Sequence, residues 1–391
     1  MRRIAVFTTA VVTFFAVVAL VAGGWFYSSE ILAVPVAGEY STSLTITDVD
    51  PAAETVTLDT LNSEAVTLDT VGLITERGNV VLSGTPRFFD TTVERRATLI
   101  SGEWPQSGDA AAVSVDMYVG DPQDTLDLPF DEVQIAGELG SMPAWQIIPD
   151  GADTHTWVIL VHGRGAHRPS NNRYVPALHD LGLPTLNISI RNGPGAAEDP
   201  QGYGRFGYSE WQDLDAAVSY LRDTFAAQRL ILVGSSQGAS VSLMFTRQSA
   251  YADMVDGMVL ISPLISLDAT LYLAAEQRGI PRPLIRPLLT SAKIVTRLRS
   301  GMVFSELEHQ KHVDAYPADL PILFTHGNRD LTVPFAPTPP FAAALGPRAV
   351  FVHYVDIDHV REWNSDPERF DRDLRQFIVG DVLGDALEQA S

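Results

Sequence analysis

The chain contains no cysteine among its 391 residues. Disulfide bonds, thiol nucleophiles and zinc sites with cysteine ligands are therefore excluded. Basic residues are also scarce, because 27 Lys and Arg stand against 48 Asp and Glu, for a formal net charge of −21 at pH 7. Such a charge repels phosphate groups, so we expect no nucleic-acid partner. With 46% hydrophobic residues, the chain can bury the core of one large domain and an additional module.

Charged residues are absent from residues 4–27, a stretch long enough to cross a bilayer as a helix. Arg2 and Arg3 precede it, which places the amino terminus in the cytoplasm and the rest of the chain outside. A cleaved signal peptide is the alternative, and Ala-Gly-Gly at residues 22–24 is its nearest approach to a cleavage site. The length of the run favours an uncleaved signal anchor over residues 1–33, in a single-pass protein of the cell membrane.

Residues 34–129 are predicted to form a small β-rich module. The segment is rich in Thr, Val, Asp and Gly, and its short alternating runs are typical of strands. Residues 54–60, Glu-Thr-Val-Thr-Leu-Asp-Thr, recur almost unchanged at residues 64–70. Two copies are too few for a solenoid, so the repeat predicts a pair of β-strands. We interpret the module as a structural spacer or buttress, with binding of a partner as the alternative.

Residues 130–391 are predicted to form an α/β domain, because short apolar segments alternate there with helical ones. We expect eight strands in a mostly parallel sheet, the first two as an antiparallel hairpin and most later ones separated by helices such as residues 211–224. The expected strands are 132–136, 144–148, 157–161, 185–189, 230–233, 258–261, 322–325 and 350–354. Between the sixth and seventh strands, residues 264–318 are too many for a simple connection, so we expect a helical cap.

The cap reverses the sign of the local charge. Residues 277–305 contain six basic residues and no acidic one. The basic residues are Arg278, Arg282, Arg286, Lys293, Arg297 and Arg299. The spacing of the four at 282, 286, 293 and 297 returns to a similar helical face each time. We hypothesise that this face meets the headgroups of an anionic membrane or an anionic amphipathic substrate, with a solvated helix surface as the alternative.

The fifth expected strand leads directly into Gly234-Ser235-Ser236-Gln237-Gly238. A strand, a Gly-x-Ser-x-Gly motif and a helix are typical of a tight turn that exposes a nucleophilic serine above a sheet. The glycines are needed because the turn brings backbone and helix so close that a Cβ atom would clash. Ser236 lies in register with both glycines and is the predicted nucleophile. An ordinary strand-to-helix connection is the alternative unless the other parts of a site follow.

A serine nucleophile requires a base, and the base requires a group that orients it. On this kind of sheet the acid follows the serine and the histidine comes last. Asp330 follows the seventh expected strand, at the sheet edge where ligands collect. His359 is the only histidine in the loop after the eighth strand. Asp356 and Asp358 compete with Asp330, but they lie beside His359 in the sequence, which is poor geometry for reaching its ring.

The oxygen that becomes negative during acyl transfer needs two backbone N–H donors. One is expected at Gln237, directly after the nucleophile. The other is expected at Arg164, in the glycine-containing loop after the third strand. Glycines in that loop allow the backbone to approach a substrate closely.

The remaining histidines have structural interpretations. His162 and His326 each precede a glycine at a strand end, and we interpret both as structural. His309 and His312 lie in the insertion without a plausible third metal ligand. We therefore expect no metal and no cofactor.

These segments together resemble the α/β-hydrolase superfamily over about residues 131–387. The segments at 157–165, 191–192, 210–217 and 363–364 are similar to bacterial serine hydrolases near the prolyl-oligopeptidase and esterase branches. The resemblance implies an eight-stranded sheet with helices on both faces and a Ser-His-Asp triad. Such relatives commonly have Gly-Trp-Ser-Met-Gly-Gly at the turn, whereas this chain has Gly-Ser-Ser-Gln-Gly-Ala. The smaller Ser235 and the polar Gln237 leave the shape of the acyl pocket open.

The expected function is that of a membrane-anchored, extracytoplasmic serine hydrolase. It would cleave a carboxylic ester of a small molecule or a lipid-like compound through an acyl-enzyme on Ser236. A short-peptide peptidase or an acyltransferase with the same triad is the alternative within this chemistry. An inactive surface-binding module with the same fold is the alternative of another class.

Overall fold

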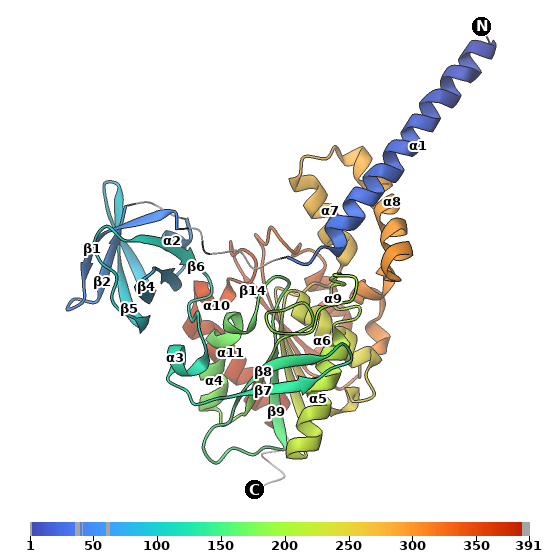
Figure 1. Ribbon diagram of the computed structural model, residues 1–391. Coiled ribbons are helices and arrows are strands. Elements are labelled where there is room, and N and C mark those ends of the chain that lie inside the picture. The colour runs from blue at the N-terminus through green and yellow to red at the C-terminus, as the bar shows by residue number, and fades with distance from the viewer. Residues whose placement is uncertain (1, 36–39, 41, 60–62, 385–391) are drawn as a thin grey trace.

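The computed structural model describes residues 2–35, 40, 42–59 and 63–384 (Figure 1). Three parts follow one another along the chain. A long helix, α1 (Arg2–Leu32), is followed by a β-barrel and then by a large sheet covered with helices. The described fold therefore has the predicted order of apolar helix, β-rich module and α/β domain.

The β-rich module is a closed barrel with the strand order β1-β2-β5-β4-β3-β6. Its strands are β1 (Leu44–Asp50), β2 (Thr55–Leu58), β3 (Val71–Ile74), β4 (Gly78–Phe89), β5 (Thr92–Gly102) and β6 (Ala110–Ser114). Neighbouring strands pair antiparallel. Because side chains alternate between the two faces of a strand, every second apolar residue points inward. Val56, Leu58 and Leu73 fill the interior in this way and are fully buried.

The predicted strand at residues 64–70 is wrong. The first copy of the repeat forms β2, but the second forms the short helix α2 (Ser63–Thr67). The buried side chain of Arg95 on β5 donates hydrogen bonds to the backbone carbonyl groups of Ala65 and Leu68. These bonds satisfy carbonyl groups that a helix leaves without partners at its carboxyl end. A contact from a distant strand thus selects helix for one copy of the repeat.

The α/β domain contains a sheet with the strand order β14-β13-β12-β11-β9-β10-β8-β7. The strands are β7 (Asp131–Ala136), β8 (Ser141–Ile147), β9 (Thr156–Val161), β10 (Thr185–Ile188), β11 (Arg229–Ser235), β12 (Val255–Ile261), β13 (Ile322–Gly327) and β14 (Ala349–Tyr354). The pairs β7–β8 and β8–β10 are antiparallel, and the other pairs are parallel. The eight predicted strands are confirmed, with small differences at their ends.

Helices cover both faces of this sheet. One face packs against α5 (Trp211–Phe225), α6 (Gln237–Gln248) and α9 (Thr338–Leu345), and the other against α4 (Val175–Asp180) and α11 (Pro367–Phe377). Short helices complete the domain and its connection to the barrel: α3 (Pro122–Leu126), α10 (Glu362–Ser365), η1 (Arg168–Tyr174), η2 (Ala252–Met254), η6 (Gly346–Arg348) and η7 (Ile378–Val382). Leu214, Val218 and Leu221 of α5 are fully buried, because their spacing of four and three residues places them on one face of the helix.

The insertion between β12 and β13 forms α7 (Leu267–Gln277), α8 (Arg282–Ser300) and the short turns η3 (Phe304–Leu307), η4 (His309–Lys311) and η5 (Val313–Ala315). The carboxyl-terminal part of α1 packs on α8, while its amino-terminal part projects away from the molecule (Figure 1). Gly24 permits this packing, because a Cβ atom there would lie 2.2 Å from Oγ of Ser291. Pro287 lies inside α8 without dividing it into two helices.

The barrel and the sheet domain meet at Asn364 of α10, whose side chain is fully buried. Its Nδ2 donates hydrogen bonds to the backbone carbonyl groups of Thr70 (3.0 Å) and Val115 (3.1 Å). Its Oδ1 accepts a hydrogen bond from Nη1 of Arg173 at 2.7 Å. One amide therefore links the barrel to the segment that directly follows His359.

Replacing Asn364 by alanine should lower the free energy of unfolding by about 1–3 kcal/mol, because buried polar groups lose their partners. Urea unfolding of the purified protein measures this change. Gln123→Ala removes an exposed amide from α3 and serves as the control, which should leave the unfolding midpoint unchanged. An Asn364→Ala midpoint equal to that of the wild type would contradict the assignment of this junction.

Candidate active site

Ser236 occupies a strained turn between β11 and α6. Its backbone has φ of 54° and ψ of −114°, a conformation that L-residues rarely adopt. The turn is pressed against β9, since a Cβ atom on Gly238 would lie 2.1 Å from the carbonyl oxygen of Val161. A Cβ atom on Gly234 would lie 2.5 Å from the carbonyl oxygen of Gly238. Both glycines of the motif are thus required by close contacts that hold the serine in place.

The structure brings Ser236, Asp330 and His359 together from three strand ends. Nε2 of His359 lies 2.9 Å from Oγ of Ser236. Nδ1 of the same ring lies 2.6 Å from Oδ2 of Asp330. A carboxylate at Nδ1 holds the proton on that nitrogen, which leaves Nε2 as the basic atom that faces the serine hydroxyl.

Asp356 and Asp358 occupy other positions. Oδ1 of Asp358 accepts hydrogen bonds from the backbone N–H groups of Leu331 (2.9 Å) and His359 (2.7 Å). The backbone N–H of Asp356 donates to Oδ1 of Asn328. Asp358 therefore joins the two loops that carry the acid and the base, whereas the carboxylate at the imidazole ring is that of Asp330.

His326 has a closer relation to the site than its structural interpretation suggested. Its Nε2 lies 3.0 Å from Oδ2 of Asp330, and its Nδ1 lies 2.9 Å from Oγ1 of Thr338. Burial raises the pKa of Asp330, but the hydrogen bonds from His326 and His359 outweigh burial and hold that pKa well below its usual range. Asp330 is therefore ionised across the physiological pH range. The four-residue spacing between His326 and Asp330 was the signal in the sequence.

The two predicted oxyanion donors flank the nucleophile. Gln237 is the first residue of α6, and Arg164 follows Gly163, where an added Cβ atom would lie 3.2 Å from Cβ of Ser236. Within the part of the chain that the structure describes, the backbone N–H groups of Gln237 and Arg164 donate no hydrogen bond. Both groups are free to bind a substrate oxygen.

Two cavities meet beside Ser236. The smaller one, of about 350 Å³, is lined by Ser236 and His359 and by largely apolar side chains. Its apolar lining includes Ile31, Phe206, Leu264, Leu271, Ile280, Leu288, Leu289 and Val333. The larger one, of about 760 Å³, is rich in glycine and polar residues of the segment 190–204. We call them the apolar and the polar cavity; Pro35, Arg164 and Gln237 line both.

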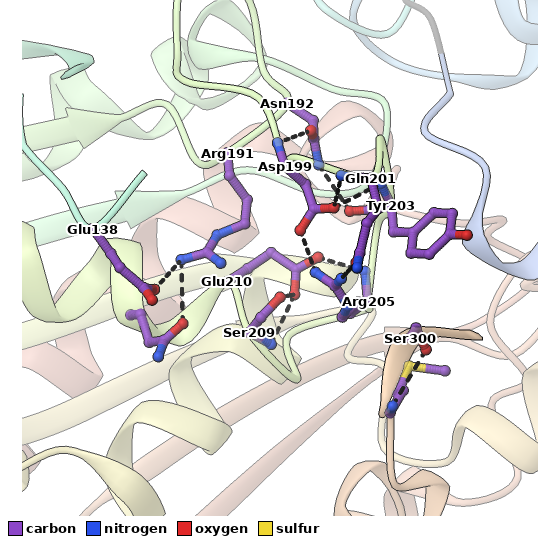
Figure 2. Close-up of polar contacts among 12 residues, drawn as sticks. Glu138, Arg191, Asn192, Asp199, Gln201, Tyr203, Arg205, Ser209, Glu210 and Ser300 are labelled. Atoms are coloured by element: carbon purple, nitrogen blue, oxygen red, sulfur yellow. Dashed lines mark hydrogen bonds and ion pairs between the residues drawn. The ribbon is translucent and has the colours of Figure 1, made fainter. Parts of the chain in front are cut away.

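Buried charged groups lie at the polar cavity, and Figure 2 shows the contacts of Arg191, Arg205 and Glu210 among them. Arg191 forms an ion pair with Asp213, with Nη2 at 2.7 Å from Oδ1. Arg205 forms a second buried ion pair with Asp199. The carboxylate of Glu210 accepts hydrogen bonds from the backbone N–H groups of Arg205 and Gly207. Because these charged groups are paired with one another or with the backbone, they hold the loop in shape.

His162 and His309 have local partners. Burial lowers the pKa of His162 to about 4, and its Nδ1 lies 2.9 Å from the carbonyl oxygen of Gly163. His309 contacts Oγ of Ser240 and the hydroxyl of Tyr316. Among residues 2–35, 40, 42–59 and 63–384, no group of three His, Asp or Glu side chains has the arrangement of a metal site.

Comparison with known proteins agrees with this fold. Residues 152–319 match the family described as serine aminopeptidase, S33. An esterase from Pyrococcus furiosus is 21% identical, with a TM-score of 0.53 over 67% of this chain and 95% of that chain. The sheet domain therefore has the α/β-hydrolase fold. Another solved structure that the comparison finds is an esterase from Exiguobacterium antarcticum, 14% identical, with a TM-score of 0.46 over 63% of this chain and 99% of that one. A search of curated proteins finds no match.

In this protein the insertion covers the nucleophile, because α7 and α8 line the apolar cavity together with Ser236. Half of the predicted basic face is neutralised within the insertion, by acids of α7. The ion pairs are Arg282 with Glu276 at 2.7 Å and Lys293 with Asp268 at 2.8 Å. Arg286 and Arg297 are exposed.

A buried carboxyl group lies close behind the base. Glu362 is fully buried, and its Oε1 accepts a hydrogen bond from Oγ of Ser262 at 2.7 Å. The same hydroxyl accepts a hydrogen bond from the backbone N–H of Val360, next to His359. Burial raises the pKa of Glu362 to about 7.

Glu362 should make the folded protein less stable as the pH rises from 5 to 8. An unfolded chain releases this proton near pH 4, at about the reference value of glutamic acid. The folded chain keeps the proton up to a pH of about 7. Over this interval the folded state binds more protons, so its stability falls with rising pH.

Glu362→Gln keeps an acceptor for Ser262 without a titrating charge. The wild type should lose on the order of 2–3 kcal/mol of its free energy of unfolding between pH 5 and 8, and Glu362→Gln should not show this loss. Urea unfolding at both pH values measures the difference, with exposed Glu368→Gln as the control. Parallel stability curves for the wild type and Glu362→Gln would show that Glu362 does not titrate in this range.

Proposed function

We propose that this serine hydrolase cleaves carboxylic esters through an acyl-enzyme on Ser236, outside the membrane that its N-terminal helix crosses. The observation that supports the proposal is the hydrogen-bonded chain from Asp330 through His359 to Ser236. This chain ends at an apolar cavity beside two unoccupied backbone N–H groups. Such an arrangement suits attack on an uncharged carbonyl group.

In the first half-reaction, Nε2 of His359 accepts the proton of the Ser236 hydroxyl while Oγ attacks the ester carbonyl carbon. The carbonyl oxygen becomes negative and accepts hydrogen bonds from the backbone N–H groups of Gln237 and Arg164. The ionised Asp330 stabilises the imidazolium ion. His359 then returns its proton to the departing alkoxide, the C–O bond breaks, and the acyl group remains on Ser236.

In the second half-reaction, a water molecule takes the place of the alcohol. His359 accepts one proton from that water, and the resulting hydroxide attacks the acyl carbon. Collapse of the second tetrahedral intermediate returns the proton to Oγ of Ser236 and releases the carboxylic acid. An alcohol in place of water would make the same site an acyltransferase.

The lining of the apolar cavity favours an ester over a peptide. Its one carboxylate among the described lining residues is Glu30, which forms an ion pair with Arg278 at 3.0 Å. Every carboxylate of that lining is thus already paired, so none is available to bind the ammonium group of a peptide. The second candidate is a peptidase that acts on short peptides, which the serine aminopeptidase description of the matched family favours. Turnover of p-nitrophenyl esters against aminoacyl-p-nitroanilides separates the two.

Ser236→Ala and His359→Ala should each abolish covalent labelling by a fluorophosphonate and reduce ester turnover by several orders of magnitude, roughly to the rate supported by binding and the oxyanion donors. Asp330→Asn should also reduce ester turnover severely, because it favours the wrong tautomer of the His359 imidazole. Asp358→Asn is the matched control, since its carboxylate binds backbone N–H groups. Normal turnover by Ser236→Ala, or greater damage from Asp358→Asn than from Asp330→Asn, would refute these roles.

We further propose that α1 is retained as an anchor. Residues 13–32 of this helix are long and apolar enough to cross a membrane, a property shared by anchors and signal sequences. Retention is supported by the packing of Gly23 and Gly24 on α8. The 19 residues from Ile4 to Ala22, which precede these two glycines, would span about 28 Å as a helix. That length is close to the hydrocarbon thickness of a bilayer, about 30 Å.

The protein should therefore fractionate with membranes and resist extraction by salt and by carbonate. Hydrophobic burial, which neither treatment removes, would hold the helix in place. Fractionation followed by amino-terminal sequencing makes the measurement. A soluble protein that begins near Gly24 would show that the segment is a cleaved signal peptide.

A further inference from the structure

The carboxyl-terminal end of α1 lines the apolar cavity. Tyr27, Glu30 and Ile31 contribute to its wall, together with Ser236 and His359. Ile31 is 5% exposed and belongs to a buried cluster with residues from the elements around the cavity. The helix that begins with the apolar segment thus ends as a wall of the candidate active site.

Contacts from several elements fix this end of α1. The guanidinium of Arg164, whose backbone is a predicted oxyanion donor, donates hydrogen bonds to the carbonyl groups of Ile31 and Ala33. Its Cζ lies 4.6 Å from the ring centroid of Phe206. Nη1 of Arg299 on α8 lies 3.0 Å from Oγ of Ser28. These contacts fix the position of this wall relative to the oxyanion loop and to the cap.

The wall also forms part of the rim. Glu30 and Arg278, which line the cavity and pair with each other, connect α1 to the end of α7. Gln277, the last residue of α7, donates a hydrogen bond to the carbonyl group of Leu331, next to Asp330. Leu331 lines the cavity and is 61% exposed. The cavity is therefore bounded by α1, α7 and the loop of the acid, with an apolar side chain at its edge.

The two cavities share a boundary at Pro35, Arg164 and Gln237; large aliphatic side chains line the apolar one, whereas glycines and a few polar side chains line much of the polar one. A carbonyl carbon attacked by Ser236 must lie at this boundary, because its oxygen would bind the backbone N–H groups of Arg164 and Gln237. An apolar chain gains free energy by leaving water for the apolar cavity, whereas a polar group keeps hydrogen-bond partners in the polar one. The apolar cavity has the size of a small-molecule site.

We propose that the end of α1 is a specificity-determining wall, and that the apolar cavity takes the acyl chain of an amphipathic ester whose polar alcohol lies in the polar cavity. The proposal rests on the proposed function, since it names the substrate class of the same site. Because the wall continues directly into the helix proposed to cross the membrane, the cavity lies next to a bilayer surface. Amphipathic esters concentrate at that surface.

Ile31→Trp tests the wall by filling the apolar cavity near Ser236. In the detergent-solubilised full chain, Ile31→Trp should lower the ratio of kcat/KM for p-nitrophenyl dodecanoate to kcat/KM for p-nitrophenyl acetate at least about tenfold. Ile31→Ala enlarges the cavity and should move the preferred chain length upward. Val21→Trp is the matched control, because Val21 is exposed on the same helix and lines neither cavity.

Covalent labelling of Ser236 by ethyl and dodecyl fluorophosphonates gives a second readout that does not require ester turnover. Labelling by the ethyl reagent at the wild-type rate shows that a variant is folded. Ile31→Trp should lower the ratio of the dodecyl labelling rate to the ethyl labelling rate. A wild type that is labelled but hydrolyses no ester of the series would contradict the ester proposal, while the ratio of labelling rates still tests the wall.

The wall proposal is overturned if the dodecyl-to-ethyl ratio is the same in the wild type, Ile31→Trp and Ile31→Ala. It is also overturned if Val21→Trp changes the ratio as much as Ile31→Trp does. Should Ile31→Trp fail to react with the ethyl reagent, Ile31→Ala alone decides, because a smaller apolar residue keeps the contacts of the helix backbone.

Discussion

The hydrogen bond between Asp330 and His359 is the interaction on which the candidate site depends. It joins the loops after β13 and β14, and it sets the ring orientation that places Nε2 at 2.9 Å from Oγ of Ser236. The carboxylate is held on its other side by His326, and the base is followed by the buried group of Glu362. The strained turn presents Ser236 to the apolar cavity, but a serine without a base is a weak nucleophile. Ser236 can therefore react only because the Asp330–His359 pair lies beside it.

Two parts outside the sheet support this pair. The barrel reaches the loop of the base through Arg361, whose Nη1 donates to the carbonyl group of His359 at 2.7 Å while its Nε donates to Glu64 at 2.8 Å. Asn364 adds a buried link a few residues further along. Helix α1 reaches the opposite side, where its backbone binds the side chain of Arg164. These bonds favour our interpretation of the barrel as a buttress, here at the histidine, while α1 completes the cavity at the oxyanion loop.

The fold and the main site residues could be predicted from the sequence because their signals are local. Buried strands are short apolar runs, the turn at Ser236 needs two glycines at fixed spacing, and chain order distinguishes Asp330 and His359 from their neighbours. What could not be predicted depends on partners distant in the chain. Helix α2 replaces an expected strand because Arg95 binds its carbonyl groups. Ile31 looks like any other apolar residue of a membrane segment, and only packing places it at the cavity.

The central claim is that Ser236 carries an acyl group during turnover. The most direct measurement mixes the solubilised protein rapidly with a p-nitrophenyl ester, records the release of p-nitrophenol, quenches with acid and maps the modified peptide by mass spectrometry. The account predicts a burst that approaches one equivalent of the protein whenever deacylation is the slow step, and an added acyl mass on Ser236. An acyl mass on Ser235 or on any residue other than Ser236 would contradict it. Turnover of the ester with no acyl mass on Ser236, under conditions in which deacylation is the slow step, would contradict it as well.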